Sequence, residues 1–306
     1  MEKVIVAAAN GFIGQHLVLK LSEKYDVITL TRRPIEIKGA SKNVIWDGKK
    51  LDFWCNEIEG SLAFINLTGK SVNCKWTEAN KKAILDSRVE ITELIAKAIA
   101  KSKEPPKVWI NASGVSIYKE TFGDLQTESS KEMADDFLAD VTKKWEEACF
   151  SSPAQVRKVA MRTSVVLGND GGSFPIMRKL TGFFLGGKLG SGKQFFSWIH
   201  IDDYCKIITD QIIPNEKING PVNMAAPESV TNAEFMRSLR KAMGKPFGIP
   251  TPKFLLKIGA SIIGTEPSLV LKSTCVVSEV LKQNEHVFLY PQVDSALEEL
   301  IGRTRG

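Results

Sequence analysis

Short apolar runs alternate with longer amphipathic segments up to about residue 167, and this alternation constrains the fold more than any other feature. The shorter runs span four to seven residues, as in KVIVAAA at Lys3–Ala9 and LAFINL at Leu62–Leu67. Such runs, separated by helices, are typical of parallel strands buried on both faces. Right-handed crossovers then predict an α/β fold with a doubly wound parallel sheet. We expect strands at Lys3–Ala9, Tyr25–Thr31, Asn43–Trp46, Leu62–Leu67, Val108–Ala112 and Val156–Leu167, and helices up to Lys24, over Thr77–Ala100 and over Asp135–Phe150.

The second part of the chain, after about residue 168, has a different residue pattern. Seven glycines fall between Gly171 and Gly192, which predicts a long irregular loop over a cleft. We therefore expect a first domain over residues 1–168 and a smaller, mostly helical lobe over 169–306, with later strands free to rejoin the first sheet. Its expected helices are Ile201–Ile213, Asn232–Met243, Lys253–Ile263 and Val293–Ile301.

Composition narrows the class of protein. Hydrophobic residues make up 43% and charged residues 25%, as in ordinary globular proteins. The net charge of +6 is spread thinly, which argues against nucleic acid and suits a small anionic ligand. The five cysteines are scattered and form no CxxC pair, so we expect reduced thiols and no metal site. No apolar stretch approaches the ~20 residues of a membrane span. The sequence predicts a cytoplasmic protein with a small-molecule substrate and no membrane partner, and it allows a homodimer.

A turn with two glycines follows the first expected strand. In Ala8-x-x-Gly11-x-x-Gly14, Gly11 would let the backbone approach a pyrophosphate, and Gly14 would let the helix pack close to the strand. The N–H groups at the helix start favour an anion. Ala8 stands where a third glycine is usual, and its methyl group narrows the turn. The alternative is a strand-to-helix turn with packing glycines only.

The end of the second expected strand indicates which dinucleotide binds. NAD-binding units place an acidic residue there, but this strand ends in Thr31-Arg32-Arg33, and Glu36 comes too late. A hydroxyl and guanidinium groups suit the 2′-phosphate of NADP(H), because Arg forms paired charge-assisted hydrogen bonds with phosphate. The alternative is a pair of solvated arginines.

Several segments resemble one family. The opening Asn10–Gly14 with Arg32 resembles the extended short-chain dehydrogenase/reductase superfamily. Other segments resemble more closely an atypical branch of this superfamily, the "epimerase family protein" branch. These segments are INLTG at 65–69, WTE at 76–78, ILDSRVE at 84–90, RTSVVLG at 162–168 and LGSGKQFFSWIHIDD at 189–203. The tail over about 251–302 resembles that branch's C-terminal domain of unassigned function.

The resemblance implies a Rossmann-type fold that holds NADP(H), with a substrate pocket between the lobes. It implies that Gly11, Phe12, Ile13 and Gly14 line the pyrophosphate and that Thr31 and Arg32 meet the 2′-phosphate. It also places Leu67, Thr68 and Gly69 beside the adenosine, Arg88 facing the cofactor and Val165 near the nicotinamide. For Arg88 the alternative is a solvated charge near Asp86 or Glu90.

The superfamily's usual catalytic pair, Tyr-x-x-x-Lys on one helix, is absent. None of the four tyrosines is followed by lysine four residues later, and Phe137 and Val141 occupy the expected positions. Neither of these side chains can transfer a proton. The usual epimerase mechanism is therefore not encoded in this chain.

A looser set of candidates remains. Ser113 follows the fifth expected strand, and Tyr118 either replaces the missing tyrosine or packs in an ordinary loop. Gln194, Trp198 and His200 could line a substrate cleft, although a lone histidine is more often structural. Two hypotheses stay open: an NADP(H)-dependent oxidoreductase or isomerase of unknown, nucleotide-sugar-like or other small substrate, and a non-catalytic NADPH-binding sensor.

Overall fold

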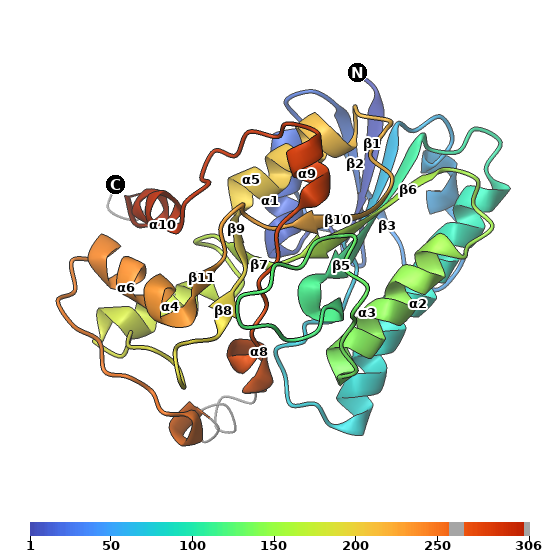
Figure 1. The fold of residues 1–306 in the computed structure, drawn as a ribbon. Helices are drawn as coiled ribbons and strands as arrows, with labels where there is room; N and C mark the ends of the chain where they lie inside the picture. Colours follow the sequence, from blue (N-terminus) through green and yellow to red (C-terminus); the bar gives the residue numbers. More distant parts are fainter. Residues whose placement is uncertain (257–265, 303–306) are drawn as a thin grey trace.

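The computed structural model describes residues 1–256 and 266–302 (Figure 1). Within these residues a seven-stranded sheet has the order β10-β6-β5-β4-β1-β2-β3, and all neighbouring strands are parallel. The predicted doubly wound α/β fold is confirmed. The strands are β1 (Lys3–Ala7), β2 (Asp26–Thr31), β3 (Lys42–Ile45), β4 (Ala63–Asn66), β5 (Val108–Gly114), β6 (Arg157–Thr163) and β10 (Gly220–Met224).

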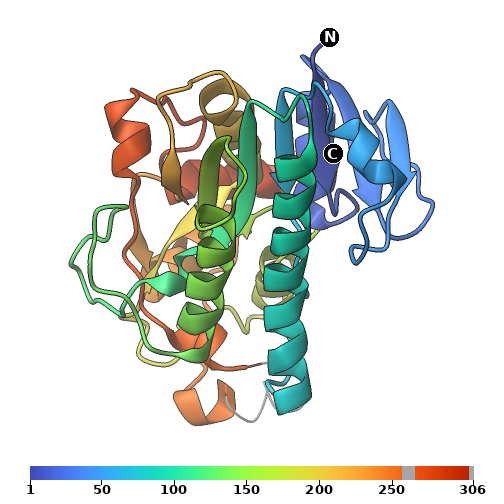
Figure 2. The same cartoon turned by 90° about the vertical axis from the view of Figure 1, so that its right-hand side faces the viewer.

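Helices cover both faces of this sheet. On one face α1 (Phe12–Leu21) and α5 (Ile201–Ile207) pack against Val4, Val6 and Ile65. On the other face α2 (Glu78–Lys101) and α3 (Phe137–Phe150) lie side by side (Figure 2). The side chains of Thr77 and Asp136 cap the starts of α2 and α3 by accepting backbone N–H groups. Both helices thus begin where sequence periodicity and capping residues agree.

The smaller lobe combines helices with two short sheets. Its helices are α4 (Phe174–Gly182), α6 (Asn232–Ala242), α8 (Ser268–Leu271) and α10 (Val293–Gly302), whereas α9 (Glu279–Gln283) packs on the large sheet beside β10. Strand β7 (Val165–Leu167) pairs with β9 (Trp198–His200), and β8 (Phe195–Phe196) pairs with β11 (Val230–Thr231). Most of the expected helix Lys253–Ile263 lies outside the described residues.

Two local expectations were wrong. The expected strand Val156–Leu167 breaks at Ser164, whose N–H and hydroxyl both donate to the carbonyl of Met224, and β7 then joins another sheet. The expected loop at 171–192 contains helix α4. Its preceding glycines serve packing, because a Cβ at Gly168 or Gly171 would lie 2.5 Å from the Phe12 side chain.

Across the described part of the chain, no helix has both the length and the apolar character needed to span a bilayer.

Candidate functional site

The small residues Ala8, Gly11 and Gly14 of the turn after β1 have different structural roles. Ala8 takes a left-handed φ of 60°, a conformation that glycine adopts with less strain. A Cβ at Gly14 would lie 2.6 Å from the carbonyl oxygen of Ala9, so Gly14 lets α1 pack onto β1. A Cβ at Gly11 would meet only the Ala8 oxygen, at 3.6 Å. The space above Gly11 is therefore free of protein and open to a ligand.

A cavity lies at the carboxyl ends of β1, β2 and β4, which we call the turn cavity. It brings together six of the predicted cofactor residues: Gly11, Thr31, Arg32, Leu67, Thr68 and Gly69. Sequence reasoning missed other lining residues, among them Trp46, Gly48, Lys49 and Lys70. The signal for them was the strand order, because residues that follow neighbouring parallel strands meet at one edge of a sheet.

The Arg32 side chain is exposed and lines the turn cavity. Among the described residues it makes no hydrogen bond or ion pair, so its guanidinium group is available to a phosphate. The Thr31 hydroxyl, by contrast, lies 2.8 Å from the Arg33 carbonyl and is used within the turn. The side chains of Phe12 and Ile13 pack against the core, so only their backbone lies at the turn.

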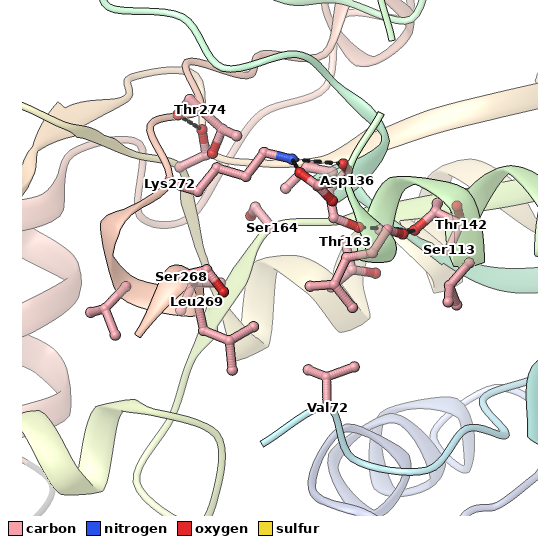
Figure 3. Close-up of a pocket in the computed structure, with 18 of the residues that line it drawn as sticks. Val72, Ser113, Asp136, Thr142, Thr163, Ser164, Ser268, Leu269, Lys272 and Thr274 are labelled. Carbon is pink, nitrogen blue, oxygen red and sulfur yellow. Dashed lines mark hydrogen bonds and ion pairs between the residues drawn. The ribbon is translucent and has the colours of Figure 1, made fainter. Parts of the chain in front are cut away.

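A second cavity, the central cavity, has a volume of about 380 Å³ and lies between the sheet and the smaller lobe (Figure 3). Predicted residues Arg88, Ser113 and Val165 line it, beside aromatic side chains from Trp76, Trp145, Phe195 and Phe196. A cavity of this size suits a small molecule.

Arg88 stands between the two cavities. Its Nη1 donates to the carbonyls of Lys70 and Ile84, at 3.0 and 2.9 Å, and its guanidinium lies over the Trp145 ring. A Cβ on Gly69 would come within 3.1 Å of this guanidinium. Burial lowers the pKa of Arg88 to about 10. The partly buried position of Arg88 therefore disfavours the alternative that it is a solvated charge on the helix surface.

Ser113 belongs to a buried polar network behind the central cavity. Its hydroxyl donates to Glu146 at 2.6 Å, and Arg162 donates to both Glu146 oxygens at 2.8 Å. Arg162 also donates to the Tyr118 hydroxyl, which donates to Asn223. Burial raises the pKa of Tyr118. Tyr118 is fully buried and does not line the central cavity, so this position favours the packing alternative over a catalytic role.

The predicted cleft residues also lie in the interior. Gln194, Trp198 and His200 are buried and do not line the central cavity, although their neighbours Phe195, Phe196 and Ser197 do. The physical reason is that these side chains have partners elsewhere: Gln194 donates to the Leu189 carbonyl at 2.9 Å, and Trp198 packs in an apolar cluster with Phe235. His200 accepts the N–H of Asp202 through Nδ1, so Nε2 donates to Glu299 at 3.0 Å. Burial lowers the pKa of His200, which keeps the ring neutral.

Sequence reasoning missed a segment of the C-terminal region that closes the central cavity. Glu266 accepts the N–H of Trp76, and Lys272 Nζ donates to Asp136 at 2.6 Å and to the Ser116 carbonyl at 3.0 Å. Burial tends to raise the pKa of Asp136, but the hydrogen bonds from Lys272 and from the Ala139 N–H hold it below its usual value. No signal short of the fold could have placed Lys272 beside Asp136, 136 residues away.

Comparisons with known proteins agree with this architecture. The model of the NAD dependent epimerase/dehydratase family matches residues 4–140, and that of a domain of unknown function, DUF1731, matches residues 251–300. The human epimerase family protein SDR39U1 is 32% identical over 98% of this chain and 99% of its own length. The epimerase family protein YfhF of Bacillus subtilis is 31% identical over 97% of each chain.

Solved structures give the same result. The human SDR39U1 structure, crystallised with NADPH, superposes with a TM-score of 0.87 at 31% identity and covers 98% of this chain and 99% of that one. A nucleoside-diphosphate sugar epimerase from Corynebacterium glutamicum reaches 0.79 at 29% identity, covering 99% of this chain and 58% of that one. The resemblance read from the sequence is thus confirmed: the chain belongs to the NAD dependent epimerase/dehydratase family, in the branch of epimerase family proteins that carry the C-terminal domain DUF1731.

Proposed function

We propose that this protein binds NADP(H) across the turn cavity and the central cavity and acts as an oxidoreductase or isomerase on a small substrate. The observation that carries the proposal is the pair of features at the turn: open space above Gly11 and an unengaged Arg32 in the same cavity. The first fits a pyrophosphate held by backbone N–H groups, and the second fits a 2′-phosphate. The human relative crystallised with NADPH supports the same cofactor.

The remaining predicted residues fit the other half of the cofactor. Gly69 lines the turn cavity, and Arg88 behind it lines the central cavity, so Arg88 would lie along the path from ribose to nicotinamide. Val165 would meet the nicotinamide end. When bound, the cofactor supplies or accepts a hydride. Ser113 would contact the substrate; its proton is committed to Glu146, so its oxygen accepts a hydrogen bond from a substrate hydroxyl.

Titration with NADPH and NADH tests the proposal, with nicotinamide fluorescence and melting temperature as readouts. We expect wild type to prefer NADPH. Arg32→Glu should weaken NADPH binding about 100-fold, because a charge-assisted pair becomes a repulsion of similar size, and should change NADH binding less than threefold.

Arg33→Glu is the matched control, since Arg33 is also exposed but does not line the turn cavity. It should change both affinities only slightly. Equal weakening of both nucleotides by Arg32→Glu would remove Arg32 from the phosphate site. Failure of wild type to bind either nucleotide would overturn the proposed function.

A further inference from the structure

The hydroxyl groups on the strand and α3 sides of the central cavity already donate their protons within the protein. Ser116 donates to Thr142 and Thr142 to the carbonyl of Leu138, at 2.9 and 2.7 Å. The other committed donors are Ser113 to Glu146, Ser164 to the Met224 carbonyl, Thr163 to the Met161 carbonyl and Ser197 to the Thr274 carbonyl. The strand and α3 sides of the cavity therefore offer a ligand acceptors rather than donors.

Lys272 provides the hydrogen-bond donor that those hydroxyl groups do not offer to a ligand. Its ammonium has three N–H donors, and the described residues accept two of them, at Asp136 and at the Ser116 carbonyl. The side chain is only 22% exposed and lines the central cavity, where Figure 3 shows it above Ser164 and beside Asp136. The third N–H of the Lys272 ammonium is thus left to donate to a ligand oxygen.

The charge balance of the cavity limits what that ligand can be. Of the described lining residues, Arg88, Asp136 and Lys272 carry charge. Arg88 already contacts two carbonyls and Trp145, and Asp136 neutralises Lys272 at 2.6 Å. Because Lys272 and Asp136 together are neutral, a diphosphate or carboxylate placed beside them would gain little attraction in return for its lost hydration, whereas an uncharged oxygen loses much less hydration. The aromatic walls fit an apolar body.

Building on the proposed function, we propose that the substrate is a small, uncharged carbonyl compound or the matching alcohol, and that Lys272, from the C-terminal region of unknown function, binds its oxygen. Lys272 would then supply the proton that the Tyr-x-x-x-Lys pair supplies elsewhere in the superfamily. In this chain Phe137 and Val141 occupy the positions of that pair and cannot transfer a proton. A donor aimed at an oxygen that gains negative charge stabilises the transition state more than the ground state.

The reduction balances with groups named here. The C=O π bond breaks, the carbon takes a hydride from NADPH, which is oxidised to NADP⁺, and the oxygen takes a proton from the Lys272 ammonium. Water returns a proton to the resulting amine. The hydrogen bonds to Asp136 and to the Ser116 carbonyl hold the Lys272 nitrogen at the same place in the cavity for the next turnover.

The experiment uses the full chain with NADPH and three probes, followed by NADPH absorbance and by melting temperature. The probes are para-tolualdehyde, para-carboxybenzaldehyde, which differs mainly by its charge, and UDP-glucose. We expect kcat/KM at least tenfold higher for para-tolualdehyde than for the carboxylate. UDP-glucose has no aldehyde or ketone group to reduce and serves as a binding probe only, so we expect it to leave the melting temperature unchanged. Lys272→Met should lower kcat/KM for para-tolualdehyde about 100-fold, the size expected for one oxyanion donor.

Matched variants separate this role from a structural one. Lys253→Met changes a cation of the same C-terminal region outside the central cavity and should leave the rate unchanged. Asp136→Asn keeps the helix cap and the ammonium but removes the ion pair, so it should lower the rate less than tenfold. Lys272→Arg should recover part of the rate lost in Lys272→Met. The affinity for NADPH should be the same in all variants.

Several results would overturn the inference. The first is a Lys272→Met variant with the wild-type rate, and the second is an equal loss of rate in Lys272→Met and Asp136→Asn. The others are a higher kcat/KM for the carboxylate than for para-tolualdehyde, a rise in melting temperature with UDP-glucose, and no reduction of either aldehyde by protein that binds NADPH. Absence of NADPH binding would count against the proposed function instead, so the two failures are distinguishable.

Discussion

Gly11 and Gly14 lie three residues apart, but a side chain at Gly14 would clash with the protein backbone whereas one at Gly11 would not. Substitutions at the two positions should therefore differ in their effects on stability and on nucleotide binding. A methyl group at Gly14 meets the backbone of Ala9 at 2.6 Å, whereas one at Gly11 meets no protein atom closer than 3.6 Å. We expect Gly14→Ala to lower the free energy of unfolding by about 1–3 kcal/mol, although alanine is the better helix former. Gly11→Ala should cost less than about 1 kcal/mol in stability but weaken NADPH binding about tenfold. Urea denaturation and nucleotide titration check both, and the reverse pattern would refute the assignment.

Residues of the turn cavity were predictable because their signals are local. Gly11 and Gly14 have fixed spacing after a strand, and Arg32 ends the next strand. Tyr118 was ambiguous for the opposite reason. Its hydroxyl is held by Arg162 and Asn223, which lie 44 and 105 residues away, and sequence spacing carries no trace of either contact.

Strand β6 is joined to helix α3 by a buried ion pair, and this connection makes a prediction at the level of elements. Glu146 receives hydrogen bonds from Arg162 and Ser113, and both members of the pair are nearly inaccessible. Glu146→Ala should lower the free energy of unfolding by about 3–5 kcal/mol, because it leaves the Arg162 charge buried and unpaired. Glu147→Ala, at the next and exposed position, should change it by less than about 0.5 kcal/mol. Similar urea midpoints for the two variants would contradict this account.

Most strands of the large sheet were predictable from apolar runs, since β1, β2 and β4 are buried on both faces, whereas the edge strand β3 buries only Val44 fully. The break between β6 and β7 was not, because the cause is a hydrogen bond from Ser164 to Met224, 60 residues later. Helix α4 was not predicted because glycines lie on both sides of it; those that precede it, Gly168 and Gly171, pack against the Phe12 side chain.

At the scale of the whole molecule, the central cavity is assembled from segments that lie far apart in the sequence. Ser113 comes from β5, Arg88 from α2 and Lys272 from the C-terminal region. The family resemblance implied a pocket between the two lobes, but the sequence did not show which C-terminal residues form one of its walls. The contact between Lys272 and Asp136 exists only after the sheet has brought α3 under the returning chain.

The same returning chain carries a histidine that couples stability to pH. His286 follows α9, its ring contacts Phe288, and neither ring nitrogen has a partner among the described residues. Burial, with a smaller contribution from Lys206, lowers the pKa of His286 to about 4. Between about pH 6.5 and that value the unfolded chain therefore binds more protons than the folded one, so stability falls as the pH falls through this window.

We expect His286 to contribute a loss of about 1–2 kcal/mol between pH 7 and pH 4.5, reduced from the full linkage value because the ring is only partly shielded from water. His286→Leu should remove this loss, so the free energies of unfolding of wild type and variant should diverge as the pH falls. Gln283→Leu, at an exposed position on α9, should shift stability by an amount that does not vary with pH. Urea denaturation at a series of pH values measures both. If the wild-type and His286→Leu curves run parallel, the imidazole of the folded chain takes up its proton as readily as that of the unfolded chain, and the returning segment is more open to water than its packing indicates.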